Sequence, residues 1–168
     1  MRDLQIKEMP LEEKYDKLLD GYLLVVATDY ALHKELGVID KSNDLSVKVQ
    51  KKMFPSVLGM AFKVLKAISP GKAFKQVTDQ YVYSIQRFIP LSNIELTMVS
   101  NREASVRIKN CPVLKRQRDL VKKAGLDLDP RFICEMDAKI NPEVAKEFGV
   151  DLTLELEENG CITTAKLK

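Results

Sequence analysis

Apolar residues in the first half of the chain recur about every 3.6 positions, which predicts a series of amphipathic helices. The first predicted helix runs from Leu11 to Leu36 and is closed by Gly37. A second begins at Ser42 or Asn43, and Pro55 separates it from a third that ends at Ile68. A fourth follows the Ser69-Pro70-Gly71 turn and continues to Phe88, although the stretch from Tyr81 to Ile89 also has the composition of a strand. Residues 1–89 are therefore expected to be the helical half.

The second half of the chain changes to a period of two, which is typical of half-buried strands. Residues 94–100 and 104–110 form one predicted hairpin, and a helix then runs from Pro112 to Gly125. After an irregular stretch with a short helix from Pro142 to Phe148, residues 150–157 and 161–167 form a second hairpin around Glu158-Asn159-Gly160.

This order of elements predicts an α+β fold, with N-terminal helices packed on one face of a C-terminal antiparallel sheet of about four strands. Residues 93–168 would contain the two hairpins and the helix between them. The sequence shows no internal repeat or linker, so residues 1–168 are expected to form a single domain.

Composition narrows the class of protein. The chain has 168 residues, 27 Lys and Arg against 24 Asp and Glu, and a net charge of +3. This charge is too small to indicate nucleic-acid binding. The longest apolar run, residues 22–27, is too short for a membrane span, and the first ten residues do not resemble a secretory signal. We therefore expect a cytoplasmic protein.

The three cysteines carry the most distinctive chemistry. Cys111 lies between a strand and a helix, where exposed helix N–H groups stabilise a thiolate and lower its pKa. Cys134 follows 23 residues later, and Cys161 follows after another 27. If the strands next to Cys111 and Cys161 belong to one sheet, all three sulfur atoms can meet at one end of it.

Two interpretations of these thiols remain open. Three thiolates and one further ligand make a tetrahedral zinc site, and the candidate fourth ligands are Glu135, Asp137, Glu157, His33 or water. Alternatively, each cysteine is a small buried hydrophobic residue. The odd number and wide spacing of the cysteines argue against a disulfide scaffold.

His33 is the single histidine and lies one helical turn after Asp29. Residues four positions apart share a helix face, so Asp29 can orient the imidazole as a base or ligand. The simpler interpretation is a histidine at a helix end that hydrogen-bonds to Asp29.

Aromatic and aliphatic residues at helical spacing usually form a core, but helices on a small sheet can also enclose an apolar cavity. The residues expected to line such a cavity are Tyr22, Val26, Phe62, Tyr81 and Ile85.

Residues 106–118 read V-R-I-K-N-C-P-V-L-K-R-Q-R, and A-G-L follows at 124–126. A second cysteine lies 23 residues after the first, and a third opens the last strand. Together these features resemble the 4-vinyl-reductase-type superfamily. This superfamily includes small-ligand-binding domains and L-2-amino-thiazoline-4-carboxylate hydrolase-like proteins. The Asp20-Gly21-Tyr22 helix and the first hairpin are compatible with it.

The resemblance implies an α+β fold, an apolar pocket between helices and sheet, frequent dimers and, in some members, a zinc site of three cysteines and a glutamate. Cys111 and Cys161 would match the first and last cysteines. Where those members have E-x-x-C, this chain has Glu155-Leu156-Glu157-Glu158. The implied metal set is therefore Cys111, Cys134, Cys161 and Glu157, holding zinc, with iron as the alternative metal.

Three functional hypotheses follow. The first is a homodimeric module that binds a small apolar or aromatic molecule and carries a cysteine-based metal site. The alternative is a hydrolase that opens a small sulfur–nitrogen heterocycle, with Cys111 and His33 as catalytic residues or with a metal-bound water. The third is a structural dimer that assembles other partners.

Overall fold

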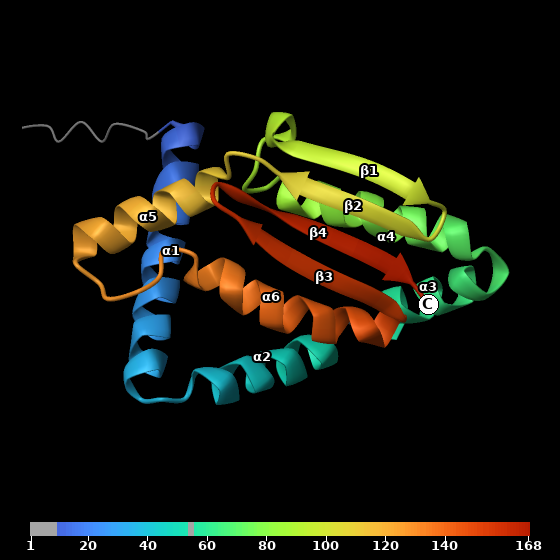
Figure 1. Cartoon of the computed structure of the whole chain (residues 1–168), viewed down its shortest axis with the longest axis horizontal. Coiled ribbons are helices and arrows are strands. Elements are labelled where there is room, and N and C mark those ends of the chain that lie inside the picture. Colours follow the sequence, from blue (N-terminus) through green and yellow to red (C-terminus); the bar gives the residue numbers. More distant parts are fainter. Residues whose placement is uncertain (1–9, 54–55) are drawn as a thin grey trace, which may run out of the picture.

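The computed structural model describes residues 10–53 and 56–168 (Figure 1). Four helices precede the four-stranded sheet in the chain, and two more lie between its two hairpins. The helices are α1 (Leu11–Glu35), α2 (Ile39–Met53), α3 (Ser56–Ile68), α4 (Pro70–Ile85), α5 (Pro112–Ala124) and α6 (Phe132–Ala145). The strands are β1 (Ile94–Ser100), β2 (Glu103–Ile108), β3 (Val150–Glu157) and β4 (Gly160–Leu167), and two short 3-10 helices span Leu91–Asn93 and Lys146–Phe148. The predicted α+β class is confirmed.

The sheet has the order β1-β2-β4-β3, and each neighbouring pair is antiparallel. The two hairpins therefore meet along β2 and β4, where Ile108 lies opposite Cys161 and Val106 opposite Thr163. Ala104, Val106 and Ile108 are buried, so the face that carries them is the one covered by helices.

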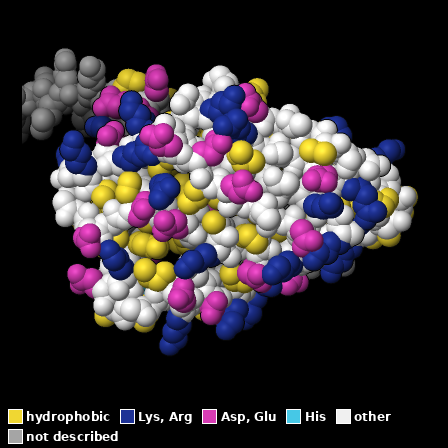
Figure 2. Space-filling view, in the orientation of Figure 1, with side chains coloured by type: hydrophobic (Ala, Val, Ile, Leu, Met, Phe, Trp, Pro, Cys, Tyr) yellow, Lys and Arg dark blue, Asp and Glu magenta, His cyan; other side chains and the backbone are white. Residues whose placement is uncertain are grey.

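The other face of the sheet is polar. Charged side chains pair across its strands, as Arg107 does with Glu157 and Lys109 with Glu95. On the molecular surface seen in the orientation of Figure 1, Lys and Arg are interspersed with Asp and Glu (Figure 2). Exposed ion pairs of this kind contribute about 0–1 kcal/mol each, so they serve solubility more than stability.

Two groups of buried side chains hold the helices in place. At one end, Phe62 and Phe74 of α3 and α4 pack against Ala104, Val150 and Leu167 of the sheet. At the other end, Phe132 of α6 packs with Ala27, Val121 and Leu128, which joins α1, α5 and α6. Figure 1 shows α1 at this second end, far from α3.

Most predicted elements are confirmed, but α6 corrects the expectation of an irregular stretch with a short helix from Pro142. The helix begins at Phe132 and contains Pro142 within its last turn. Phe132, Ile140 and Val144 are buried along one side, and this packing outweighs the single backbone hydrogen bond that proline removes.

Smaller differences concern helix ends. The second helix starts at Ile39, two residues after Gly37 at φ +65°, rather than at Ser42 or Asn43. The predicted break at Pro55 lies outside the described residues. The stretch from Tyr81 is helical to Ile85. None of the helices in the described part of the chain combines the length and apolar character that a membrane span needs.

Candidate functional site

The register of the sheet brings Cys111 and Cys161 to the same end of the molecule. Cys161 is the second residue of β4 and lies opposite Ile108, three residues before Cys111. The backbone N–H of Cys111 donates a hydrogen bond to the carbonyl oxygen of Asn159 at 2.9 Å. This bond ties the start of α5 to the turn that precedes Cys161.

Cys134 joins the other two cysteines from α6. A negative charge on either Cys111 or Cys161 would raise the pKa of Cys134, which means that all three thiols lie within electrostatic reach of one another. Asp137 lies on α6 three residues after Cys134, and its charge would also raise the pKa values of Cys134 and Cys161. We call Cys111, Cys134, Cys161 and Asp137 the thiol cluster.

Burial sets the protonation of this cluster. Burial removes water from around the thiols. This is the main reason why the pKa of Cys134 is raised to about 12 and that of Cys161 to about 11. Burial also raises the pKa of Asp137 to about 6. Without a cation, Cys134 and Cys161 are therefore protonated near neutral pH.

Gly160 permits the close approach of strands beside the cluster. A Cβ atom built on Gly160 would lie 1.8 Å from the carbonyl oxygen of Ile108. No side chain fits there, because the obstructing atom belongs to the backbone of β2. The glycine thus keeps Cys161 close to the chain segment that leads into Cys111.

Tyr81 of α4 closes the edge of the cluster nearest the sheet centre. Its hydroxyl lies 3.3 Å from Thr163 Oγ1. Thr163 is two residues after Cys161 and therefore lies on the same face of the sheet. Burial raises the pKa of Tyr81, and charges on Cys161 and Asp137 would raise it further.

A pocket of about 290 Å³ opens next to Cys111. It is lined by Asn110, Cys111, Leu114, Lys115, Arg118 and Asn159. Arg118 donates hydrogen bonds to Asn159 Oδ1 at 2.7 Å and to the carbonyl oxygen of Glu158, so it holds one wall of the pocket. The pocket combines an apolar surface with two cationic side chains, Lys115 and Arg118.

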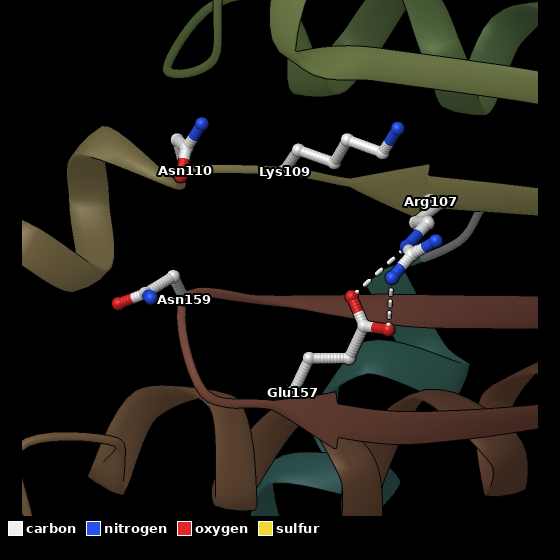
Figure 3. A pocket seen from close by; sticks show the side chains of 5 residues that line it. All are labelled: Arg107, Lys109, Asn110, Glu157 and Asn159. Carbon is white, nitrogen blue, oxygen red and sulfur yellow. Dashed lines mark hydrogen bonds and ion pairs between the residues drawn. The ribbon is translucent and has the colours of Figure 1, made fainter.

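A neighbouring pocket of about 210 Å³ lies on the polar face of the sheet and contains Glu157, one of the predicted metal ligands (Figure 3). Its carboxylate accepts hydrogen bonds from Arg107 Nη2 at 2.6 Å and Nε at 3.0 Å. Strand alternation places Glu157 and Cys161 on opposite faces, because Leu156 is the residue opposite Cys161. The charge of Glu157 would still raise the pKa of Cys161, whereas the charge of Asp137 would raise the pKa values of both Cys134 and Cys161. Asp137 is therefore the carboxyl group that the fold brings to two of the thiols on the helix-covered side.

The structure does not bring Cys111 and His33 together. His33 Nδ1 lies 3.6 Å from Asp29 Oδ2 in the last turns of α1, which places the two side chains side by side but is longer than a hydrogen bond. Arg116, in the second turn after Cys111, instead contacts Asp16 and Asp20. At 1.5 Å per residue, Asp20 lies roughly 20 Å and Asp16 roughly 26 Å along α1 from His33.

The five residues expected to line an apolar cavity are also spread over the molecule. Tyr22 is 56% exposed on α1, whereas Val26 packs against the core around Phe132. Phe62 belongs to the core at the other end, and Tyr81 and Ile85 lie on α4. The five residues therefore do not line one common cavity.

The thiol cluster is not a preformed metal site. Within residues 10–53 and 56–168, no three His, Cys, Asp or Glu side chains are already arranged to hold a metal ion. The cluster supplies suitable donor atoms, but side-chain rotation is needed to direct them at one point.

Gln117 is the remaining unusual residue near this end of α5. Its side chain is buried, with 1% exposed, and neither Nε2 nor Oε1 has a hydrogen-bond partner among the described residues. Because an unpaired buried amide is unfavourable, we expect Gln117→Met to raise the free energy of unfolding by about 1–2 kcal/mol. Urea denaturation measures the change, and Gln80→Met at an exposed position of α4 serves as the control. Equal effects of the two substitutions would contradict the expectation.

Sequence reasoning included Asp137 among four possible ligands but missed the basic pocket beside Cys111. The spacing of Phe132, Met136, Ile140 and Val144 was the available signal for α6. A helix there places Cys134 and Asp137 on one side, one turn apart.

No protein-family model matches the sequence. No curated protein matches it either. A crystal structure of a trafficking protein particle complex subunit 3 from Naegleria fowleri, covalently bound to palmitic acid, is similar at 12% identity and a TM-score of 0.41, covering 88% of this chain and 95% of that chain. At these values the similarity carries no argument about family, ligand or partner, and the 4-vinyl-reductase-type resemblance stays a prediction.

Proposed function

We propose that the protein is a small-ligand-binding module in which the thiol cluster holds one zinc ion beside the pocket at Cys111. The observation that carries this proposal is the convergence of three cysteines and Asp137 from three separate parts of the chain. They come from the start of α5, from the first two turns of α6 and from the start of β4.

The chemistry of the donor atoms favours a thiophilic metal ion. Zinc binds thiolate sulfur and carboxylate oxygen in tetrahedral sites, and iron shares the preference for thiolates. A bound cation reverses the electrostatics of the cluster, because it stabilises the thiolates that burial otherwise disfavours. Asp137 would supply the fourth ligand in place of Glu157.

The pocket beside Cys111 indicates what kind of molecule would bind. Lys115 and Arg118 provide positive charge, Asn110 and Asn159 provide amides, and Leu114 provides an apolar surface. A small molecule with an acidic group and a short apolar part matches this lining. The proposed ligand site is thus more polar than the cavity expected from sequence.

Zinc titration of the purified, metal-free protein tests the proposal. We expect one equivalent of bound zinc, and a drop in affinity of about tenfold or more for Cys134→Ser and for Asp137→Asn, since each removes a ligand. Ferrous iron in a parallel titration identifies the preferred metal.

The control is Glu157→Gln, which removes the other predicted carboxylate ligand on the opposite face and should leave zinc affinity unchanged. Binding of less than about a tenth of an equivalent, or wild-type affinity in Cys134→Ser, would contradict the proposal. Loss of affinity in Glu157→Gln but not in Asp137→Asn would reject the assignment of the fourth ligand.

A further inference from the structure

One stretch of the chain carries positive charge without any negative charge. Residues 45–78 contain seven lysines and no Asp or Glu, whereas the rest of the chain holds 20 Lys and Arg against 24 Asp and Glu. The net charge of +3 is therefore the sum of a strongly basic segment and a slightly acidic remainder. Such asymmetry indicates that one part of the surface meets an anionic partner. The segment forms most of α2, all of α3 and the first half of α4.

Three lysines of this segment are exposed on α2 and α3 without an acidic partner. They are Lys48 and Lys52 of α2 and Lys63 of α3, and none of them has an ion pair with any of the residues 10–53 and 56–168. Glu147, the carboxylate that reaches α2, is already bound to Lys51 at 2.9 Å. The unpaired charge at this part of the surface is therefore positive.

The outward face of α2 combines its two unpaired lysines with aliphatic side chains. Leu45 is 61% exposed and Val49 is 43% exposed. In a helix of 3.6 residues per turn, Leu45, Lys48, Val49 and Lys52 fall within an arc of about 100°. The opposite side of α2 carries the buried residue Asn43 and packs against α6.

The outward face of α3 repeats this combination. Its inner side carries Phe62, which belongs to the core formed with α4 and the sheet. Its outer side carries Lys63 together with Val64 and Ile68, which are 60% and 78% exposed. Lys and Arg side chains gather at the lower right of the molecular surface, over the end of α2 and over α3 (Figure 2). We call the outward faces of α2 and α3 together the lysine face.

We propose that the lysine face binds the surface of a lipid bilayer that contains anionic phospholipids. Its lysines are attracted to the phosphate groups of the lipid heads, and the long side chains leave the backbone at the level of these heads. Its aliphatic side chains enter the boundary between the head groups and the acyl chains. Exposed helix faces that combine lysine with aliphatic residues are typical of helices that lie in the plane of a membrane interface.

The aliphatic side chains favour a bilayer over a nucleic acid. A nucleic acid offers phosphates to Lys and Arg and bases to aromatic side chains. Residues 45–78 contain no arginine, and their described aromatic side chains, Phe62 and Phe74, are buried. On a nucleic acid the four aliphatic side chains of the lysine face would stay in water, whereas a bilayer buries them.

Co-sedimentation with lipid vesicles tests the proposal. The probes are vesicles of phosphatidylglycerol and phosphatidylcholine in equal parts, and vesicles of phosphatidylcholine alone. We expect the protein to bind the mixed vesicles less tightly as salt is added, and not to bind the neutral ones. Lys52→Glu combined with Lys63→Glu should lower the partition coefficient at least tenfold, because each lysine near an anionic membrane contributes about fivefold.

Lys122→Glu combined with Lys123→Glu is the matched control for charge. Both lysines are exposed on α5, at the other end of the molecule from α3 (Figure 1), and this variant has the same net charge as the first. It should bind the mixed vesicles within about threefold of the wild type, since screening limits the reach of exposed charges to about 10 Å. Equal losses in the two variants would overturn the proposal, and so would a wild-type protein that does not bind the mixed vesicles.

Ile68→Ser tests the apolar part of the contact. We expect it to lower the partition coefficient about fivefold, because it removes apolar surface that enters the bilayer. Val25→Ser is the control, since Val25 is 68% exposed on α1. Unchanged binding in Ile68→Ser would overturn the proposal in favour of a purely electrostatic contact with a nucleic acid or an acidic protein. A thermal melt confirms that each variant is folded. The lysine face contains no residue of the thiol cluster, so the outcome is independent of the zinc proposal.

Discussion

Replacing Gly160 by alanine is expected to destabilise the protein by about 3 kcal/mol. The added methyl group would lie 1.8 Å from the carbonyl oxygen of Ile108, far inside van der Waals contact. Relief requires β4 to move away from β2, which disrupts the pairing of Ile108 with Cys161. It also disturbs the hydrogen bond from Cys111 to Asn159. We therefore expect the same substitution to weaken zinc binding.

Urea denaturation at a single protein concentration measures this effect. Gly21→Ala is the matched control, because a Cβ atom at Gly21 in the middle of α1 meets nothing within 4 Å. That substitution should stabilise the protein by roughly 0.5–1 kcal/mol through helix propensity. A Gly160→Ala protein whose stability lies within about 0.5 kcal/mol of wild type would show that β2 and β4 are not held so closely.

Asp137 is expected to make the stability of the metal-free protein fall as the pH rises. Burial raises its pKa from 3.8 to about 6, so the folded state holds this proton more tightly than the unfolded state. The stabilisation is complete below about pH 4 and is lost between about pH 4 and pH 6. At 1.36 kcal/mol per pKa unit, the loss amounts to about 3 kcal/mol above pH 7.

Denaturation in the presence of a chelator at a series of pH values measures this loss. Asp137→Asn should remove about 3 kcal/mol of the pH dependence, whatever its effect on stability at a single pH. Asp127→Asn is the control, because the Asp127 side chain is fully exposed. If Asp137→Asn retains the wild-type decline between pH 4 and pH 7, Asp137 is not the buried carboxyl group that causes it.

Local patterns were sufficient to predict most elements. Each signal acts within a few residues of the chain. Examples are the apolar periodicity of α1, the proline at the start of α5, the glycine after the end of α5 and the alternation in β3. The exception was α6, where Pro142 was interpreted as a helix start although burial of Phe132 and Val144 keeps the helix continuous. Proline removes one hydrogen bond, whereas two packed side chains stabilise the helix by several times as much.

The candidate site was predictable only in part. Cys111 and Cys161 were expected to meet because their strands were expected to share a sheet, and the order β1-β2-β4-β3 places them at the same end. The choice between Asp137 and Glu157 depended on which face of the sheet α6 covers. The dispersal of Tyr22, Phe62 and Tyr81 likewise depended on how the helices pack.

The amino-acid sequence by itself determined most of the helices, the two hairpins and the α+β class, because periodicity and turn chemistry act locally. Only the tertiary structure decided that Asp137 lies near the thiols, that a pocket with two cationic side chains opens beside Cys111 and that large apolar side chains of α1 are exposed. These features arise from contacts between residues far apart in the chain. Such contacts are selected by the packing of whole faces, which no short stretch of sequence specifies.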